Sequence, residues 1–231
     1  VVSYWSAQVT GGSGALVNEI DEVAWLDPQA AHDRLSYARD QDQLLAVVRF
    51  EQAGLLDTWP LVLVRHAHAV PRSAWTGEDP LRPLDGDGRR RAHAIAPLLE
   101  AYGVRRLLSS PSVRCAATVA PYAEASGVRL RTRRGLSEEG FAEDPERAAG
   151  HLQRLLERAR PAALCTHGPL LPSLLDRLEP LLHLDGEGAV DTVESFALAR
   201  DDKLVKGEAL VCHVRGRGPS AQVVGVERHL P

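Results

Sequence analysis

Hydrophobic and polar positions from residue 61 onward alternate between short apolar runs and longer segments with helical spacing. Leu61–Arg65, Arg106–Ser109 and Ala162–Thr166 are the short runs, and they are typical of buried strands. In residues 88–101 and 144–159, apolar side chains recur every three or four positions, which predicts amphipathic helices. This alternation of strands and helices favours an α/β fold.

Cap and turn residues predict where further elements begin and end. Ser110-Pro111 and Asp144-Pro145 each place a capping side chain before a first-turn proline, so a helix is expected to start at each pair. Another helix is expected to hold Leu174 and Leu178. Further strands are expected around residues 195–198, 209–214 and 221–226.

The N-terminal quarter of the chain has its own pattern of strands and helices. Asp27-Pro28 supplies a cap and a first-turn proline for a short helix that ends near Leu35. The sequence therefore predicts two domains, residues 1–53 and 61–231, with residues 54–60 as the linker. The other elements expected in the first domain are strands at Val1–Trp5 and Glu22–Leu26 and a helix at Gln41–Ala53.

Composition narrows the function classes. The chain has 231 residues, 44% hydrophobic and 25% charged, as in ordinary globular proteins. A net charge of −4 provides no overall basic face, so we expect no nucleic-acid partner. No apolar run of about 18 residues is present, so we expect no membrane partner. The cysteines form no CxxC pair or disulfide framework, which favours a cytoplasmic location; they are Cys115, Cys165 and Cys212.

The chain contains no methionine. We therefore expect that Val1 is not the translation start and that the gene product is longer than this sequence.

Two of the predicted strands run directly into a histidine. Leu61–Arg65 is followed by His66, and Ala162–Thr166 is followed by His167. In open α/β sheets, ligands bind beyond the carboxyl ends of the strands. Both histidines are therefore expected at the edge of the sheet where chemistry takes place.

Three arginines are expected near that edge. Arg65 adjoins the first histidine, Arg82 lies in the loop before the next helix, and Arg114 lies in the first turn of the helix after Ser110. Guanidinium groups bind phosphate oxygens in pairs, and several together neutralise the charge that develops in phosphoryl transfer. A histidine with these arginines indicates a phosphoryl-transfer enzyme with a nucleophilic histidine.

These residues belong to five short motifs that follow one another in a fixed order over residues 61–231. The order resembles that of the histidine phosphatase superfamily, which includes cofactor-dependent phosphoglycerate mutases. Arg82-Pro83-Leu84 gives the greatest similarity to the SixA-type phosphohistidine phosphatases. The resemblance implies a three-layer α/β sandwich with a mostly parallel sheet. The motifs are Arg65-His66-Ala67-His68, Arg82-Pro83-Leu84, Ser110-Pro111-Ser112-Val113-Arg114, Leu136-Ser137-Glu138 and Thr166-His167-Gly168.

The resemblance also implies a role for each site residue. His66 is expected to attack phosphorus and become a phosphohistidine that water then hydrolyses. Glu138 matches the general acid that protonates the leaving oxygen, with neighbouring Glu139 as the alternative. His167 is expected to act both in catalysis and in phosphate binding. No metal ligand is implied. The residues expected to bind the phosphoryl oxygens are Arg65, Arg82, Arg114 and His167.

The sequence departs from the family pattern at three positions. Ala67 stands where glycine is usual, His68 where an acidic residue is frequent, and Ala117 where glutamine is common. None of these changes removes a predicted nucleophile or phosphate ligand, so an intact site is expected.

The N-terminal residues resemble the last strands and helix of a Nudix hydrolase, and the expected fold of this segment is a small α+β remnant. A Nudix domain followed by a SixA-like domain is the layout of actinobacterial MutT-type enzymes that act on 8-oxo-guanine nucleotides and diadenosine polyphosphates. The Nudix box and its carboxylates are absent, so Mg²⁺ is expected only in a longer protein that carries them. The segments that carry the resemblance are Tyr4-Trp5, Asp21–Leu26, Ala30–Leu35 and Tyr37–Asp40.

This second resemblance favours a nucleoside polyphosphate as the small-molecule substrate and a contact with the Nudix domain of the longer protein. The SixA branch lacks the carboxylate at the position of Glu138, so Glu138 suggests a leaving group that needs a proton.

Three alternatives stay open on sequence grounds. The SixA resemblance favours a protein phosphohistidine as the substrate. A degenerate phosphatase domain would bind or regulate the Nudix portion without catalysis. His66 and His68 could instead chelate zinc in a metal-dependent hydrolase, although Val70 and Pro71 stand where the metallo-β-lactamase signature has Asp and His.

Overall fold

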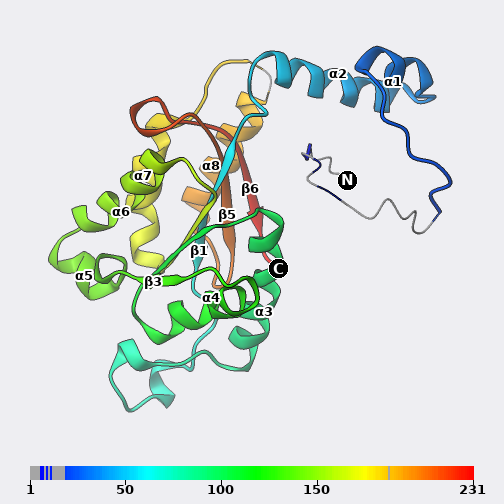
Figure 1. The fold of residues 1–231 in the computed structure, drawn as a ribbon. Coiled ribbons are helices and arrows are strands. Elements are labelled where there is room, and N and C mark those ends of the chain that lie inside the picture. Colours follow the sequence, from blue (N-terminus) through cyan, green and yellow to red (C-terminus); the bar gives the residue numbers. More distant parts are fainter. Residues whose placement is uncertain (1–5, 8, 10, 12–18, 187) are drawn as a thin grey trace. The chain divides into compact units, whose positions relative to one another are not determined.

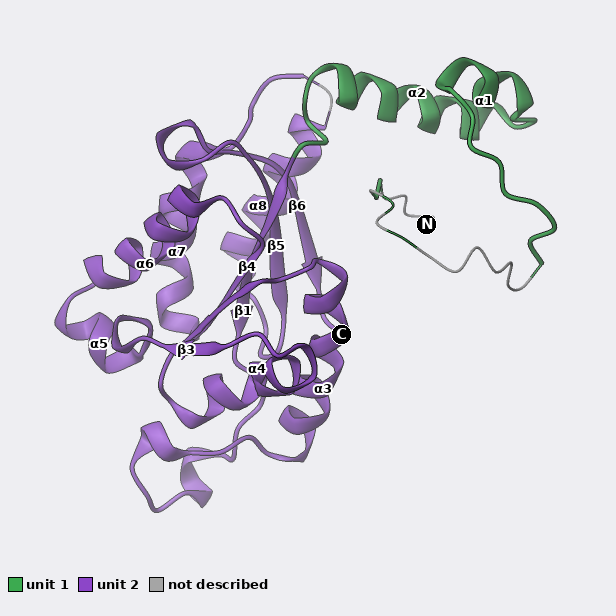
Figure 2. Cartoon of the chain, in the orientation of Figure 1, with its two compact units in different colours: residues 1–57 green, residues 58–231 purple. Residues whose placement is uncertain are grey.

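Two compact units make up the chain, Val1–Asp57 and Thr58–Pro231, and Figure 2 colours them separately. The computed structural model describes residues 6, 7, 9, 11, 19–186 and 188–231. The predicted strand Val1–Trp5, which includes two residues of the Nudix resemblance, lies outside the described residues.

The first unit contains two helices in its described part, α1 (Pro28–Arg34) and α2 (Ala38–Gln52). The predicted cap of α1 is confirmed, because Asp27 Oδ1 accepts hydrogen bonds from the backbone N–H groups of Gln29 and Ala30, both at 3.0 Å. The second helix is confirmed as well, although it begins three residues earlier than the expected Gln41.

The strand predicted at Glu22–Leu26 is wrong, because these residues form no regular structure. Trp25 exposes 80% of its surface and Val23 exposes 62%. A strand needs a neighbouring strand to take its backbone hydrogen bonds, and the described residues of this unit offer none. The apolar residues of the segment therefore give no evidence of strand structure by themselves.

The second unit is a six-stranded sheet with helices on both faces (Figure 1), and the predicted α/β class is confirmed. The strand order is β3-β2-β4-β1-β5-β6. The first four strands run parallel, whereas β5 is antiparallel to both of its neighbours. The strands are β1 (Trp59–Arg65), β2 (Arg106–Ser109), β3 (Leu130–Thr132), β4 (Ala162–Thr166), β5 (Ala209–Arg215) and β6 (Gln222–His229).

Most helices of this unit lie where the sequence predicts them, with shifts at their N-termini. The helix expected from Ser110 begins two residues beyond Pro111, after an N-cap at Ser112. The helix expected from Asp144 begins at Glu146. The helices are α3 (Gly86–Ala101), α4 (Val113–Ser126), α5 (Glu138–Glu143), α6 (Glu146–Arg158), α7 (Leu171–Leu178) and α8 (Ala189–Asp201).

Four elements or boundaries differ from the prediction. The strand expected at residues 195–198 is wrong, because this segment lies in α8. The buried positions of α8 follow helical spacing, but this spacing cannot be recognised within the four residues 195–198 alone. The buried residues are Ala189, Thr192, Phe196 and Ala199. Strand β3 and helix α5 were not predicted from the sequence, and β1 begins at Trp59, inside the expected linker.

The two faces of the sheet bury separate hydrophobic clusters. Alternate residues of β1 point to opposite faces, so Leu61 and Leu63 pack with α6, α7 and α8, while Val62 and Val64 pack with α3 and α4. All four side chains are fully buried. This burial on both faces fixes β1 at the centre of the sheet and therefore fixes the position of the residue that follows it.

In the described part of the chain, no helix has both the length and the apolar character needed to cross a membrane.

The contact between α3 and the loop after His66 gives a first testable prediction. A Cβ at Gly88 would lie 1.8 Å from the carbonyl oxygen of His68, so Gly88→Ala must displace α3 or the loop. We expect a loss of about 2 kcal/mol or more in the free energy of unfolding, measured by urea denaturation.

Gly150→Ala is the matched control. A Cβ there meets only the guanidinium nitrogens of Arg154, at 3.7 and 3.9 Å, within α6. This variant should gain about 0.5–1 kcal/mol, because alanine has less conformational freedom to lose than glycine. Equal effects of the two substitutions would contradict the tight contact at Gly88.

Candidate active site

The pairing of β1 with β4 brings the two predicted histidines together. Arg65 is the register partner of Thr166, and the backbone N–H of His66 donates to the Thr166 carbonyl at 3.0 Å. The rings of His66 and His167 meet edge to face, with their centroids 5.3 Å apart. Both residues are buried, at 6% and 0% exposure.

His66 is held as a neutral imidazole with one defined tautomer. Its Nδ1 lies 2.7 Å from the carbonyl oxygen of Ala67, and a carbonyl only accepts, so Nδ1 carries the proton. Burial lowers the pKa of His66 to about 3, mainly because the charged form is desolvated. The Nε2 atom therefore keeps its lone pair at neutral pH, which is the form that a nucleophile needs.

A threonine of α4 positions the backbone after His66. The Ala67 N–H donates to Thr118 Oγ1 at 2.9 Å, and that hydroxyl donates to the Arg114 carbonyl at 2.6 Å. Ala67 is absent from the described non-glycine residues with positive φ. The alanine at this position therefore causes no left-handed strain.

Buried Arg114 and His167 form a group of charges with the partly exposed Glu138. Glu138 Oε1 lies 3.2 Å from Arg114 Nη2 and 3.1 Å from His167 Nδ1. Arg114 is 1% exposed. The structure thus brings together four of the predicted residues, since His167 also contacts His66.

The charges of this group reinforce one another. The hydrogen bond from His167 lowers the pKa of Glu138 to about 2, with help from Arg114. Burial opposes a charge on His167, but hydrogen bonds with Cys115 and Glu138 outweigh it and raise the His167 pKa to about 9. At neutral pH the group therefore contains a carboxylate, an imidazolium and a guanidinium.

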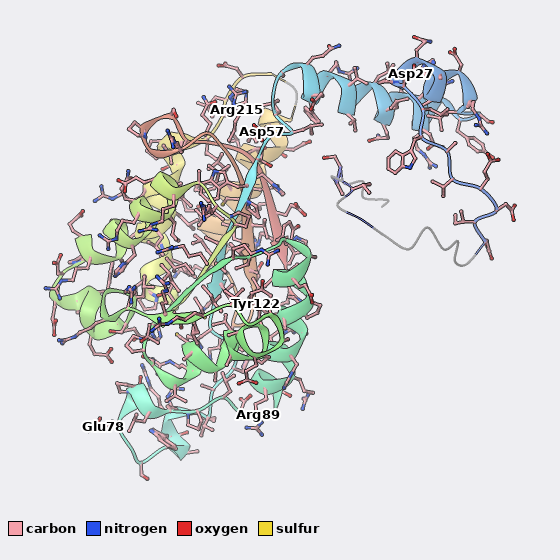
Figure 3. The ribbon with its side chains drawn as sticks, in the orientation of Figure 1. Asp27, Asp57, Glu78, Arg89, Tyr122 and Arg215 are labelled. Atoms are coloured by element: carbon pink, nitrogen blue, oxygen red, sulfur yellow. The ribbon has the colours of Figure 1, made fainter. Side chains whose placement is uncertain are left out.

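Asp79, which the sequence analysis missed, connects three arginines. Its Oδ1 lies 3.0 Å from both Arg82 Nε and Arg72 Nε, and its Oδ2 lies 3.0 Å from Arg114 Nη2. Glu78, labelled in Figure 3, marks the loop between β1 and α3 that carries Asp79. Arg82 is therefore connected to the site through Asp79. The one sequence feature that could have indicated this role for Asp79 is its position three residues before Arg82.

These ion pairs set the pKa of Asp79. Burial favours the neutral carboxyl, but hydrogen bonds from Arg72 and Arg82 and the charge of Arg114 outweigh it and lower the pKa to about 2. Asp79 is therefore ionised and holds the guanidinium groups in place. An anion that enters the site must share these groups with Asp79 and Glu138.

Arg65 lies beside the histidines but has other partners. Its Nη1 donates to the Leu204 carbonyl at 2.6 Å. A Cβ at Gly168 would lie 3.0 Å from Arg65 Nη2, so glycine allows the guanidinium to pass close to the backbone after His167. In the described part of the chain, Nε of Arg65 and Nε of Arg114 are buried without a hydrogen-bond partner. A phosphoryl oxygen would suit the Arg114 donor, whereas Arg65 lines a separate pocket with Gly168 and Leu204.

The structure also places Ser110 and the adjacent Glu138 and Glu139 relative to the histidines. Ser110 Oγ lies 2.9 Å from His167 Nε2, so this serine contacts the site rather than capping α4.

Glu139 is exposed and forms no ion pair among the residues the structure describes, whereas Glu138 contacts both Arg114 and His167. The geometry therefore favours Glu138 over Glu139 as the carboxylate nearest the histidines.

The zinc alternative finds little support in the geometry. His68 is exposed while His66 is buried, and His66 Nδ1 is bonded to Ala67. Over the described ranges, no three His, Cys, Asp or Glu side chains gather as a metal site would require.

Comparison with known families and proteins agrees with this geometry. Residues 61–145 match the family model of the histidine phosphatase superfamily, branch 1. The chain is 34% identical over 175 residues to the 8-oxo-(d)GTP phosphatase of Mycolicibacterium smegmatis. The match covers 76% of this chain and 53% of that protein, so the chain spans about half the length of this relative.

Solved structures share the fold. A phosphohistidine phosphatase SixA from Agrobacterium tumefaciens aligns with a TM-score of 0.53 at 20% identity, covering 73% of this chain and 97% of that one. A mycobacterial glucosyl-3-phosphoglycerate phosphatase aligns with a TM-score of 0.51 at 17% identity, covering 75% and 98%. At these identities the likeness concerns the fold alone.

The buried neutral state of His66 predicts a specific pH dependence of stability. Its pKa is about 3 in the folded protein and near 6.5 in the unfolded chain, so the unfolded chain binds more protons between these values. Stability from this group is present above pH 6.5 and is lost as the pH falls toward 3. When the pH falls from 7 to 5, this group alone should lower the free energy of unfolding by about 2 kcal/mol.

His66→Asn removes this titration while keeping a polar side chain of similar shape. Urea denaturation at pH 7 and pH 5 gives the decrease in the free energy of unfolding for each protein. This decrease should be about 2 kcal/mol larger in the wild-type protein than in the variant. Identical pH dependence in the two proteins would show that His66 is not held neutral by burial.

Proposed function

Residues 58–231 form a hydrolase domain of the histidine phosphatase superfamily, and we propose that it hydrolyses nucleoside polyphosphates through a phosphohistidine at His66. The predicted membership of this superfamily is confirmed by the family match and by the relative from Mycolicibacterium smegmatis. The observation that carries the proposal is the neutral His66, with its free Nε2, beside a buried arginine and an imidazolium.

The first chemical step transfers a phosphoryl group to His66. The Nε2 lone pair forms a bond to phosphorus, and the bond between phosphorus and the leaving oxygen breaks. Arg114 and His167 stabilise the charge on the phosphoryl oxygens, and Arg65 and Arg82 are proposed to assist them. In the second step, water attacks the phosphohistidine, so that inorganic phosphate leaves and His66 regains its lone pair.

Glu138 is proposed to donate the proton that the leaving oxygen needs. With a pKa of about 2 it is ionised before substrate binds, and an ionised carboxylate cannot act as an acid. A bound phosphoryl group competes for Arg114 and His167 and adds negative charge nearby, and both effects raise the pKa of Glu138. Substrate binding therefore converts an ion-pair partner into a proton donor.

The substrate class rests on the relative and on the N-terminal residues. The relative that shares 34% identity is named an 8-oxo-(d)GTP phosphatase. We propose substrates of the 8-oxo-(d)GTP, 8-oxo-(d)GDP or diadenosine polyphosphate type. We also propose that residues 1–53 are the end of a Nudix domain, which would bind Mg²⁺ and contact the phosphatase domain in a longer protein. The proposed location is the cytoplasm.

Activity measurements on His66→Ala test the proposed function. The wild-type chain should hydrolyse 8-oxo-dGDP, 8-oxo-dGTP or a diadenosine polyphosphate, as well as p-nitrophenyl phosphate. His66→Ala should lower kcat by about 10⁴-fold or more, because no other described group takes the place of the nucleophile. Phosphate release gives the rates.

His68→Ala is the matched control, because it removes an exposed imidazole two residues away and should keep the activity. Equal loss in both variants would instead favour a zinc site. Hydrolysis of a phosphohistidine protein alone would overturn the nucleotide proposal in favour of a SixA-type activity. Turnover of none of these compounds would favour a binding module.

Glu138→Gln tests the role of the proton donor. Release of an alkoxide needs a proton, so kcat for glycerol 3-phosphate or a comparable alkyl phosphate should fall by about 10²- to 10⁴-fold. Release of p-nitrophenolate needs none, and its rate should fall far less. If both rates fall by the same factor, Glu138 serves only to hold Arg114 and His167.

A further inference from the structure

A pocket of about 390 Å³ opens beside the phosphoryl site. One wall belongs to the loop between β1 and α3, and the other to the first turn of α5. Asp79 and Glu138, which both bind Arg114, also line this pocket, so it begins where the phosphoryl site ends. Its lining residues are Arg72, Trp75, Gly77, Asp79, Glu138 and Glu139.

The aromatic ring of Trp75 is held in a fixed orientation. Its Nε1–H donates to the Glu78 carbonyl at 3.0 Å. A Cβ at Gly77 would lie 3.0 Å from Trp75 Cζ2, so the backbone there lies directly against the indole. A fixed, half-buried aromatic ring on a pocket wall is a surface on which a nucleobase stacks, because every base has a π face.

Arg72 supplies a cation between this ring and the phosphoryl site. It pairs with Asp79 at 3.0 Å and approaches Glu138 Oε2 at 3.8 Å, yet 69% of its side chain is exposed. The guanidinium is therefore positioned by the two carboxylates but stays open to solvent. It suits the second phosphate of a diphosphate or triphosphate, next to the one that His66 attacks.

Glu139 adds a carboxylate on the opposite wall. It is exposed, and within the described ranges it forms no ion pair, so both of its oxygens are available to accept hydrogen bonds. Guanine carries two adjacent donors, N1–H and the exocyclic amino group, that match a carboxylate. Adenine presents a single amino donor beside an acceptor nitrogen, which a carboxylate repels.

We propose that this pocket binds the leaving nucleotide of a guanine nucleoside diphosphate or triphosphate. The base stacks on Trp75, Glu139 accepts its two donors, and Arg72 binds the phosphate that remains with the nucleoside. The proposal rests on the proposed function and names the specificity-determining residues of that same site. When the phosphoryl group moves to His66, the bridging oxygen stays with the leaving nucleotide in this pocket.

The test compares kcat/KM for 8-oxo-dGDP, dGDP, dADP and p-nitrophenyl phosphate in the wild-type chain and three variants. Trp75→Ala should lower kcat/KM for the guanine nucleotides by about 10- to 100-fold, mainly through KM, as expected for a lost stacking contact. Trp75→Phe should restore most of this loss. Glu139→Gln should reduce the preference for dGDP over dADP by about 10-fold.

Two matched controls accompany these variants. Trp25→Ala removes an indole that is 80% exposed and lies in the first unit, and Glu124→Gln removes an exposed carboxylate on α4. Neither should change any of the four rates. Quenching of tryptophan fluorescence by dGMP, which Trp75→Phe should abolish, reports binding without catalysis.

The outcomes separate this inference from the proposed function. If nucleotides are hydrolysed but Trp75→Ala lowers the nucleotide and aryl phosphate rates by one common factor, the pocket is not the nucleotide subsite. Equal kcat/KM for dGDP and dADP in the wild-type chain overturns the role of Glu139. If p-nitrophenyl phosphate is hydrolysed and no nucleotide is, the proposed substrate class fails and this inference fails with it.

Discussion

The parallel pairing of β1 with β4 is the contact on which the rest of the site depends. Its register places the backbone of His66 against Thr166, and the two histidines that follow these strands therefore meet edge to face. The same burial that fixes β1 at the centre of the sheet also keeps water from His66. Desolvation then keeps the imidazole neutral, which is the state that the proposed attack on phosphorus requires.

Charge balance is the second constraint. Arg72, Arg82, Arg114 and His167 supply four positive charges, and Asp79 and Glu138 supply two negative charges, which leaves two positive charges. This excess of positive charge suits a phosphoryl dianion. The carboxylates hold the cations in position before substrate arrives, and they lose part of these contacts when it binds. In the proposed mechanism, the loss of these contacts raises the pKa of Glu138, so that it can take up a proton from solvent and pass it to the leaving oxygen.

The central sheet and the histidine pair could be predicted from the sequence because short apolar runs and strand-end histidines are local patterns. The strand expected at residues 195–198 failed because helical spacing became visible only over the whole of α8. Asp79 could not be predicted because its importance comes from its contacts with Arg72, Arg82 and Arg114, and nothing in the sequence distinguishes these three from the other 22 arginines. The contact of Ser110 with His167 could not be predicted either, because it depends on the pairing of β2 with β4. Roles that depend on long-range contacts need the structure.

In the proposed mechanism, His66 Nε2 forms the bond to phosphorus, and trapping the phosphoenzyme tests this directly. Rapid mixing of the wild-type chain with p-nitrophenyl phosphate, followed by an alkaline quench, preserves a phosphohistidine for ³¹P NMR and tandem mass spectrometry. We expect an acid-labile phosphoryl group on Nε2 of His66 that disappears as inorganic phosphate is released. A phosphoryl group on another residue, or full turnover with no covalent phosphoenzyme at any time, would contradict it.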